Sequence, residues 1–117
     1  PYICLRAPIK LEKKDKDEIK ALMDERLKRR ITSQPLEFPS AGSVFRNPEG
    51  MYAGKLIEDI GLKGYTIGGA TISQKHANFI VNSGNATYDD IIKLIEYTKE
   101  KVEKHYNIRL ILEQEII

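Results

Sequence analysis

Apolar side chains recur at helical spacing in the first third of the chain. They fall at i, i+3, i+4, i+8 and i+12, which places them on one face of an α-helix. These positions are Ile19, Leu22, Met23, Leu27 and Ile31. Asp15, with Glu18 three residues later, is a capping pattern at the start of this helix. Basic residues 28–30 lie in its last turn, where the helix dipole favours cations. The pattern predicts a long helix with one buried stripe.

A second long helix is predicted from Thr87, which has Asp90 at the capping-box position. Its apolar face consists of Ile91, Ile92, Ile95, Val102 and Tyr106, and Asn107 is expected to end it. A short helix is predicted over residues 52–60. Gly61 suits the left-handed position after its last turn, and Leu62 is the apolar residue that often follows.

Extended segments are predicted around these helices. Residues 2–11, 78–82 and 108–117 have strand composition, and Pro8 marks an edge position or a bulge. Residues 32–50 contain three prolines and several small residues, so a long loop with short extended pieces is expected. The predicted fold class is α+β: a small, mainly antiparallel sheet with two long helices and one short helix packed on one face.

Composition and charge narrow the function classes. The 117 residues suffice for one domain, and 19 basic against 17 acidic residues give a net charge of +2. This charge is too small to indicate nucleic acid by itself. Cys4 is the single cysteine, which excludes an intrachain disulfide and favours a reducing, cytoplasmic location. No apolar run approaches the ~20 residues of a membrane span. Because the chain starts at Pro1 without a methionine, we expect it to be part of a longer protein.

Three segments carry candidate chemistry. In SAGSVFRNP, residues 40–48, small residues before Ser43 allow close approach of a ligand, although a tight turn with a capping serine explains the same pattern. Residues 61–82 crowd glycines around Lys63, Ser73, Lys75 and His76. This segment suits either a polar groove for an anionic ligand or two tight turns, and spacing alone favours the turns.

The third segment is the predicted C-terminal strand. Glu113 and Glu115 are separated by two positions and would share one face of a strand. Beside apolar residues a carboxyl has a raised pKa and can be held neutral, but charges that protect an edge strand explain the pattern at least as well. His76 and His105 lie far apart without a cysteine partner, so no metal site is expected.

Taken together, four ordered segments resemble a known family. PLEFPSAGSVFRNPEG, AGKLIEDIGLKG, IGGATISQKHANFIVN and LEQEI are similar to the C-terminal part of the UDP-N-acetylenolpyruvoylglucosamine reductases, also called UDP-N-acetylmuramate dehydrogenases, and of their shorter, type II subclass. The resemblance implies that residues 1–14 are the last strand of a preceding flavin-binding region. It implies that residues 15–117 are the substrate-binding domain.

The same resemblance implies an oxidoreductase of bacterial peptidoglycan synthesis, which serves cell-wall biogenesis, cell shape and cell division. In this family NADPH reduces a bound FAD, and UDP-N-acetylglucosamine enolpyruvate is then reduced to UDP-N-acetylmuramate. The FAD-binding region and a catalytic arginine precede the segment that the chain resembles. No cofactor is therefore expected on this chain alone, which is expected to bind substrate at most.

Family site residues transfer by motif. The resemblance implies that Ser43 is the proton donor and Glu115 a second catalytic residue. It implies substrate contacts for Arg30, Asn47, Lys63 and His76, while Ser33 stands where relatives commonly have lysine.

Two alternatives from other classes stay open. The chain alone is a ligand-binding module without catalysis, or it is a small α+β nucleic-acid binder that uses the basic residues 26–30. The helix dipole already explains those charges, and the chain has no tryptophan and no aromatic stripe on which bases would stack.

Overall fold

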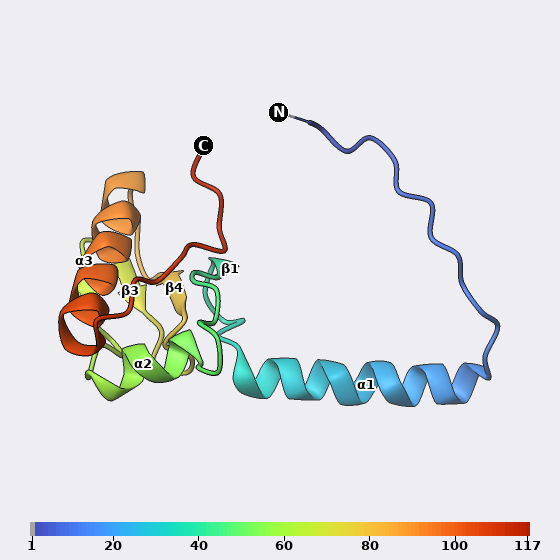
Figure 1. The fold of residues 1–117 in the computed structure, drawn as a ribbon. Helices are drawn as coiled ribbons and strands as arrows, with labels where there is room; N and C mark the ends of the chain where they lie inside the picture. Colours follow the sequence, from blue (N-terminus) through green and yellow to red (C-terminus); the bar gives the residue numbers. More distant parts are fainter. Residues whose placement is uncertain (1) are drawn as a thin grey trace. The chain divides into compact units, whose positions relative to one another are not determined.

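The computed structural model describes residues 2–117. Two compact units divide the chain, one up to Arg30 and one from Ile31 to the C-terminus, and each is described by itself. The elements are α1 (Lys16–Ser33), β1 (Ser40–Ser43), α2 (Ala53–Asp59), β2 (Thr66–Ile67), β3 (Ala70–Ile72), β4 (Phe79–Asn82) and α3 (Tyr88–Tyr106) (Figure 1). The α+β class is thereby confirmed.

The sheet of the second unit has the order β1-β4-β3-β2, and every neighbouring pair is antiparallel. A two-residue turn joins β2 to β3. Gly68 has a φ of +55°, and a side chain on Gly69 would collide with the backbone of Gly84, so this turn depends on both glycines. The sheet places the start of β4 beside the end of β1, where the site described below begins.

Helix α3 covers the sheet and closes the core of the second unit (Figure 1). Its predicted apolar face is confirmed, because Ile95 and Val102 are buried and the other three predicted positions pack against the core. Leu94 and Thr98 are buried as well. Residues from α2, β3, β4 and the segments between the elements complete the core, among them Val44, Phe45, Ile57, Ile72, Ala77, Ile80 and Leu110.

The predicted helix ends are confirmed where they depend on local chemistry. Asp15 accepts hydrogen bonds from the N–H groups of Asp17 and Glu18 at the start of α1. Thr87 and Asp90 form the predicted capping box of α3. After α2, the Leu62 N–H donates to Ile57 O and the Gly61 N–H donates to Glu58 O, which is a Schellman ending. Asn107 ends α3 in the left-handed conformation.

The prediction of a strand at residues 2–11 is wrong. These residues are exposed and form no strand pairing within the part of the chain that the structure describes. A strand needs a neighbour for its backbone N–H and C=O groups, and a single segment of suitable composition does not supply one.

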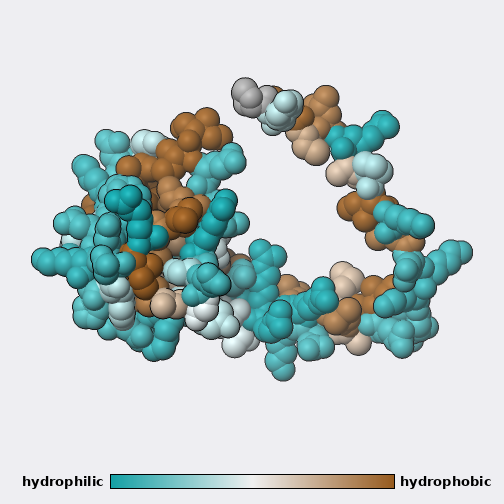
Figure 2. Space-filling view, in the orientation of Figure 1, coloured by the Kyte–Doolittle hydropathy of each residue, from teal (hydrophilic) through white to brown (hydrophobic). Residues whose placement is uncertain are grey.

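The predicted buried stripe of α1 is also wrong for this chain. Ile19, Leu22, Met23, Leu27 and Ile31 are between 42% and 64% exposed. In Figure 2, brown apolar surface is visible among hydrophilic side chains along α1. Periodic apolar residues indicate a face that is suited to burial, but they do not indicate what covers it.

The predicted C-terminal strand over residues 108–117 reduces to one antiparallel bridge between Phe45 and Leu112. The Arg46 N–H donates to Ile111 O and the Glu113 N–H donates to Val44 O, after which the chain bends. Because pairing stops there, alternation of faces does not extend to Glu115.

Candidate functional site

A recess of about 460 Å³ opens on the second unit, and four of the predicted site residues line it. These are Ser43, Asn47, Lys63 and His76. They come from the end of β1, the loop after it, the loop after α2 and the loop before β4. The structure thus brings together side chains that are up to 33 positions apart between Ser43 and His76.

An irregular pairing at the end of β1 places Ser43. Ser40 pairs with Val81 and Ser43 pairs with Phe79, so β1 carries one more residue than β4 over the same length. The extra residue is accommodated at Gly42, whose φ of +83° is a conformation that favours glycine. Such a bulge redirects the following side chain. The small residues of SAGS therefore aim Ser43, which is exposed and lines the recess.

Asn47 has a local structural role within the same recess. Its Oδ1 accepts a hydrogen bond of 3.0 Å from the Ala53 N–H, the first residue of α2. The N-cap Tyr52 makes no side-chain cap, so Asn47 satisfies a helix N–H that would otherwise lack a partner. Its amide nitrogen donates no hydrogen bond to any described residue, which leaves it available to a ligand.

His76 is held on three sides. Its Nδ1 accepts a hydrogen bond of 3.2 Å from the Asn78 N–H, and its ring meets Phe79 edge-on with centroids 4.9 Å apart. Against Gly54 of α2 the ring is so close that a Cβ there would lie 3.1 Å from Cε1. Burial lowers the pKa of His76 below its ordinary value, and the charge of Lys63 lowers it further. The neutral ring therefore carries its proton on Nε2 and is a hydrogen-bond donor there.

Three lysines give the recess its positive charge. Lys63 Nζ lies 2.9 Å from Glu58, and Lys75 Nζ donates to Ile31 O at 2.6 Å and lies 3.8 Å from Glu37. The third is Lys55, whose pKa is raised by its hydrogen bond to Asp59. Cationic groups beside a serine hydroxyl and an amide suit an anionic, hydroxyl-rich ligand.

Among the predicted site residues of the second unit, Glu115 does not line this recess. Glu115 is exposed, and Ile111 and Ile116 near it in the sequence are 63% and 47% exposed, so none of these three side chains is buried in apolar surroundings. The chain beside it is nonetheless tied to β1, since Gln114 Nε2 donates to Gly42 O at 3.2 Å. Arg30 belongs to the first unit, so the recess of the second unit is described without it.

The sequence reasoning missed Asn78, whose buried side chain also lines the recess. A polar residue directly before the apolar run 79–81 was the available signal. It also missed Lys55 and Glu58, which lie on α2 and which a helical projection from Gly54 would have placed on one side of this helix.

No group of three or more His, Cys, Asp or Glu side chains among residues 2–117 is arranged to hold a metal ion. Within the same residues no helix combines the length and apolar character that a membrane span needs.

Comparison with known proteins places this geometry in context. Residues 34–117 match the family model for the C-terminal domain of UDP-N-acetylenolpyruvoylglucosamine reductase. A reductase of this name from Thermotoga petrophila is 55% identical over 115 residues, and one from Fervidobacterium nodosum is 56% identical over 115 residues. Each alignment covers 97% of this chain, but only 40% and 37% of the respective relative.

A solved structure is similar as well. The crystal structure of UDP-N-acetylenolpyruvylglucosamine reductase from Thermus caldophilus is 42% identical, with a TM-score of 0.75 over 91% of this chain and 37% of that protein. The chain therefore spans about 40% of the length of the curated relatives that it matches.

Proposed function

Because this chain belongs to the family of UDP-N-acetylenolpyruvoylglucosamine reductase C-terminal domains, we propose that it binds the sugar-nucleotide substrate of such a reductase. The protein that contains it would reduce UDP-N-acetylglucosamine enolpyruvate to UDP-N-acetylmuramate in the cytoplasm, as a step of bacterial peptidoglycan synthesis. Residues 15–117 would form the substrate domain, and residues 1–14 would belong to the preceding flavin-binding region.

The observation that carries this proposal is the recess itself. It combines the family's serine, Ser43, with cationic and amide side chains that suit a diphosphate and a sugar. Lys63 and the Nε2–H of His76 can donate to phosphate or sugar oxygens, and the amide nitrogen of Asn47 can donate to a carbonyl or hydroxyl oxygen. Arg30 is proposed as a further diphosphate contact.

Ser43 is proposed to deliver the proton that completes the reduction. Hydride addition to the enolpyruvyl double bond leaves an enolate-like carboxylate, which is a strong base at the adjacent carbon. A serine hydroxyl is a weak acid, so transfer requires that strong base and a fixed geometry. The bulge at Gly42 supplies such a geometry, because it fixes the backbone directly before Ser43.

Glu115 is proposed to stabilise the charge that develops on the substrate carboxylate, a role that a protonated or arginine-paired carboxyl fills best. The hydrogen bond of Gln114 to Gly42 supports this role, since it holds the C-terminal segment against the strand that bears Ser43.

The hydride itself is proposed to come from NADPH through a bound FAD. The recess does not fit a flavin site: its lining includes no aromatic platform other than Tyr52 and His76, and the chain contains no glycine-rich dinucleotide motif. We therefore propose that FAD is held by the region that precedes these residues in the full-length protein.

Replacement of Ser43 tests the proposal. In the full-length protein, Ser43→Ala is expected to leave flavin reduction by NADPH intact and to slow reduction of the enolpyruvyl sugar by roughly 100-fold or more. Rapid-mixing measurement of the two half-reactions separates these effects. Ser40→Ala is the matched control, because Ser40 lies three residues earlier in the same strand and does not line the recess. This variant should keep both rates. Equal loss of both half-reactions in Ser43→Ala would refute the proton-donor role.

A further inference from the structure

Asn78 uses every hydrogen-bonding group it has. The residue is 5% exposed. Its Oδ1 accepts from the Phe45 N–H at 3.0 Å, and its Nδ2 donates to Phe45 O at 2.9 Å. Its backbone oxygen accepts from the Val44 N–H at 2.9 Å, and its backbone N–H donates to His76 Nδ1 at 3.2 Å. Asn78 is therefore hydrogen-bonded both to the backbone that follows Ser43 and to the ring of His76.

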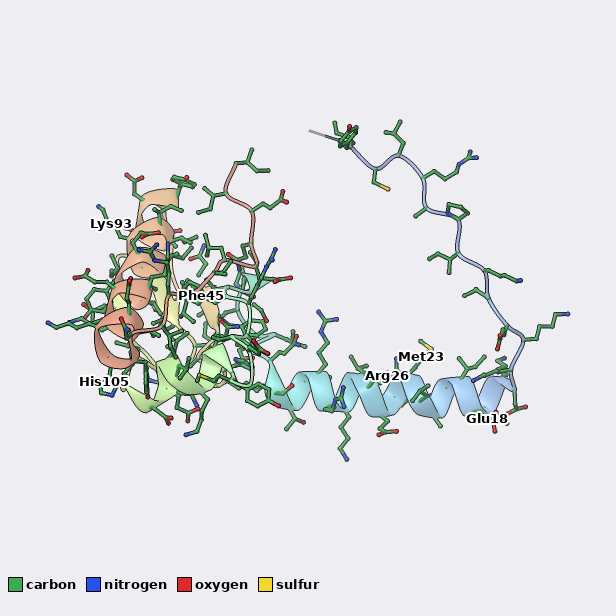
Figure 3. All side chains as sticks on the ribbon, in the orientation of Figure 1. Glu18, Met23, Arg26, Phe45, Lys93 and His105 are labelled. Atoms are coloured by element: carbon green, nitrogen blue, oxygen red, sulfur yellow. The ribbon has the colours of Figure 1, made fainter. Side chains whose placement is uncertain are left out.

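The Asn78 side chain continues the hydrogen bonding between the two segments where the pairing of β1 with β4 ends. The β1–β4 ladder stops at the pair Ser43–Phe79. Beyond this pair, the amide of Asn78 presents one donor and one acceptor to Phe45, as a residue of a neighbouring strand would. The backbone after Ser43 is thus fixed although no strand continues there. Phe45 lies in the interior of the second unit, where Figure 3 labels it.

The same contacts reach the C-terminal segment. Phe45 forms the bridge to Leu112, and Val44 O accepts from the Glu113 N–H. Fixing Phe45 therefore also fixes the strand edge to which the segment before Glu115 is tied. The backbone N–H of Asn78 also selects the His76 tautomer whose proton is on Nε2, because it donates to Nδ1.

We propose that Asn78 is a positioning residue that sets the separation of Ser43 and His76 across the recess. Both side-chain hydrogen bonds of Asn78 go to the backbone of Phe45. Asn78 therefore acts on the reaction through the residues that it holds in place. The proposal rests on the proposed function, because the geometry that it maintains is the one in which Ser43 would donate its proton.

The test measures the two half-reactions of the full-length protein. Asn78→Ala is expected to lower the rate of enolpyruvyl-sugar reduction at saturating substrate by roughly tenfold or more, since misplacement by about 1 Å can cost about 100-fold. Flavin reduction by NADPH should not change. Thr98→Val is the matched control, because Thr98 is also buried and its hydroxyl donates to Leu94 O within α3, away from the recess. It should lose stability without losing either rate.

A second variant separates positioning from mere folding. Asn78→Asp keeps the acceptor for the Phe45 N–H, and its carboxyl can replace the lost donor only when it is protonated. The ratio of its rate to the wild-type rate should therefore rise as the pH is lowered. The neighbouring side chains His76, Lys63 and Glu58 are the same in both proteins, so the ratio compares only the group at position 78. If Asn78→Ala does not fold, the pH dependence of this ratio tests the proposal instead. A ratio that rises at lower pH supports it, and a ratio that does not depend on pH would overturn it.

Other outcomes are also decisive. Folded Asn78→Ala with wild-type half-reactions, or with a loss no larger than that of Thr98→Val, would overturn the positioning role. If the wild-type protein reduces no enolpyruvyl sugar, the proposed function fails, and crystal structures then judge the inference separately. Displacement of Ser43 Oγ relative to the His76 ring in Asn78→Ala would support it, and unchanged positions would overturn it.

Discussion

The His76 ring is the side chain of the recess whose chemistry the surroundings constrain most. Burial and the charge of Lys63 lower its pKa, with Glu58 acting weakly in the opposite direction. A histidine whose pKa is lower in the folded state binds fewer protons there than in the unfolded chain. Protonation therefore favours unfolding, and stability falls as the pH drops from about 6.5 through the lowered pKa.

We expect this pH dependence to disappear in His76→Asn, whose Oδ1 can still accept the Asn78 N–H. Urea denaturation between pH 7.5 and pH 5 measures it, as the difference in unfolding free energy between the wild type and the variant. The unfolding free energy of the variant should rise relative to that of the wild type as the pH falls. A constant difference across this range would contradict the lowered pKa of His76. ¹⁵N NMR of labelled histidine should show the proton of the neutral ring on Nε2.

Lys63 is expected to act on both the ligand and this histidine. Lys63→Gln should weaken binding of UDP-N-acetylglucosamine enolpyruvate about tenfold, the effect of losing one charge-assisted hydrogen bond. It should also raise the pKa of His76, because the lysine charge lowers it. Calorimetry and an NMR pH titration measure the two effects.

Lys99→Gln provides the control for this pair of effects. Lys99 forms an ion pair of 3.2 Å with Glu96 on α3, and its side chain is 29% exposed against 27% for Lys63. The control should change neither the ligand affinity nor the histidine pKa. If Lys63→Gln left the affinity unchanged, Lys63 would not be a ligand contact.

Among the elements, the start of α3 is tied to the sheet through one carboxylate. Asp90 Oδ2 accepts from the Thr87 N–H at 3.0 Å and from the Gly69 N–H, in the β2–β3 turn, at 3.3 Å. These backbone hydrogen bonds lower the pKa of Asp90, that from Thr87 more than that from Gly69. Such a carboxylate stabilises the fold above its unfolded pKa, and this stability is lost as the pH falls through the folded pKa.

We therefore expect Asp90→Asn to destabilise the protein at pH 7 and the difference from wild type to shrink as the pH falls below about 4. Thr87→Ala should cost about 1 kcal/mol at either pH, because it removes a neutral cap. Urea midpoints at pH 7 and pH 3 test both expectations. Asp89→Asn, in the same first turn, is the control, and an equal pH-dependent loss in that variant would point to the helix dipole instead of these two hydrogen bonds.

The elements also show what the sequence can predict. The helix ends at Asp15, Gly61 and Thr87 follow the predictions, because each cap is made by side chains or backbone within a few residues. The terminal strands were mispredicted because a strand exists only where a distant segment pairs with it. Leu112 finds one such partner in Phe45, whereas residues 2–11 find none among the described residues.

The site shows the same difference between features set by nearby residues and features set by distant contacts. Ser43, Asn47, Lys63 and His76 line one recess, and motif resemblance had selected all four. Helical or strand periodicity would not have brought them together, because the bulge at Gly42 and the loops around α2 decide their directions. Asn78 lies within one of the quoted segments, but the resemblance assigned it no role. Its role depends on the backbone of Phe45, 33 positions away, and only the fold reveals that contact.

At the scale of the whole molecule, the recess and its supports lie within one unit. Ser43, Lys63, His76 and Asn78 all belong to the unit that begins at Ile31, and this unit has its own buried core. The first unit, in contrast, exposes the apolar stripe of α1. An apolar helix face of this kind is normally covered, and the chain spans about 40% of its relatives' length.

These facts predict different outcomes for binding and catalysis in this chain alone. Calorimetric titration with UDP-N-acetylglucosamine enolpyruvate should detect binding, and Lys63→Gln should weaken it, because the second unit carries the recess and the core that supports it. The same sample should not oxidise NADPH, since the flavin is proposed to lie in the region outside this chain. A yellow, NADPH-oxidising preparation would contradict the proposal that the flavin is held outside this chain. Absence of binding by this chain, in a protein that is active at full length, would show instead that the preceding region completes the recess.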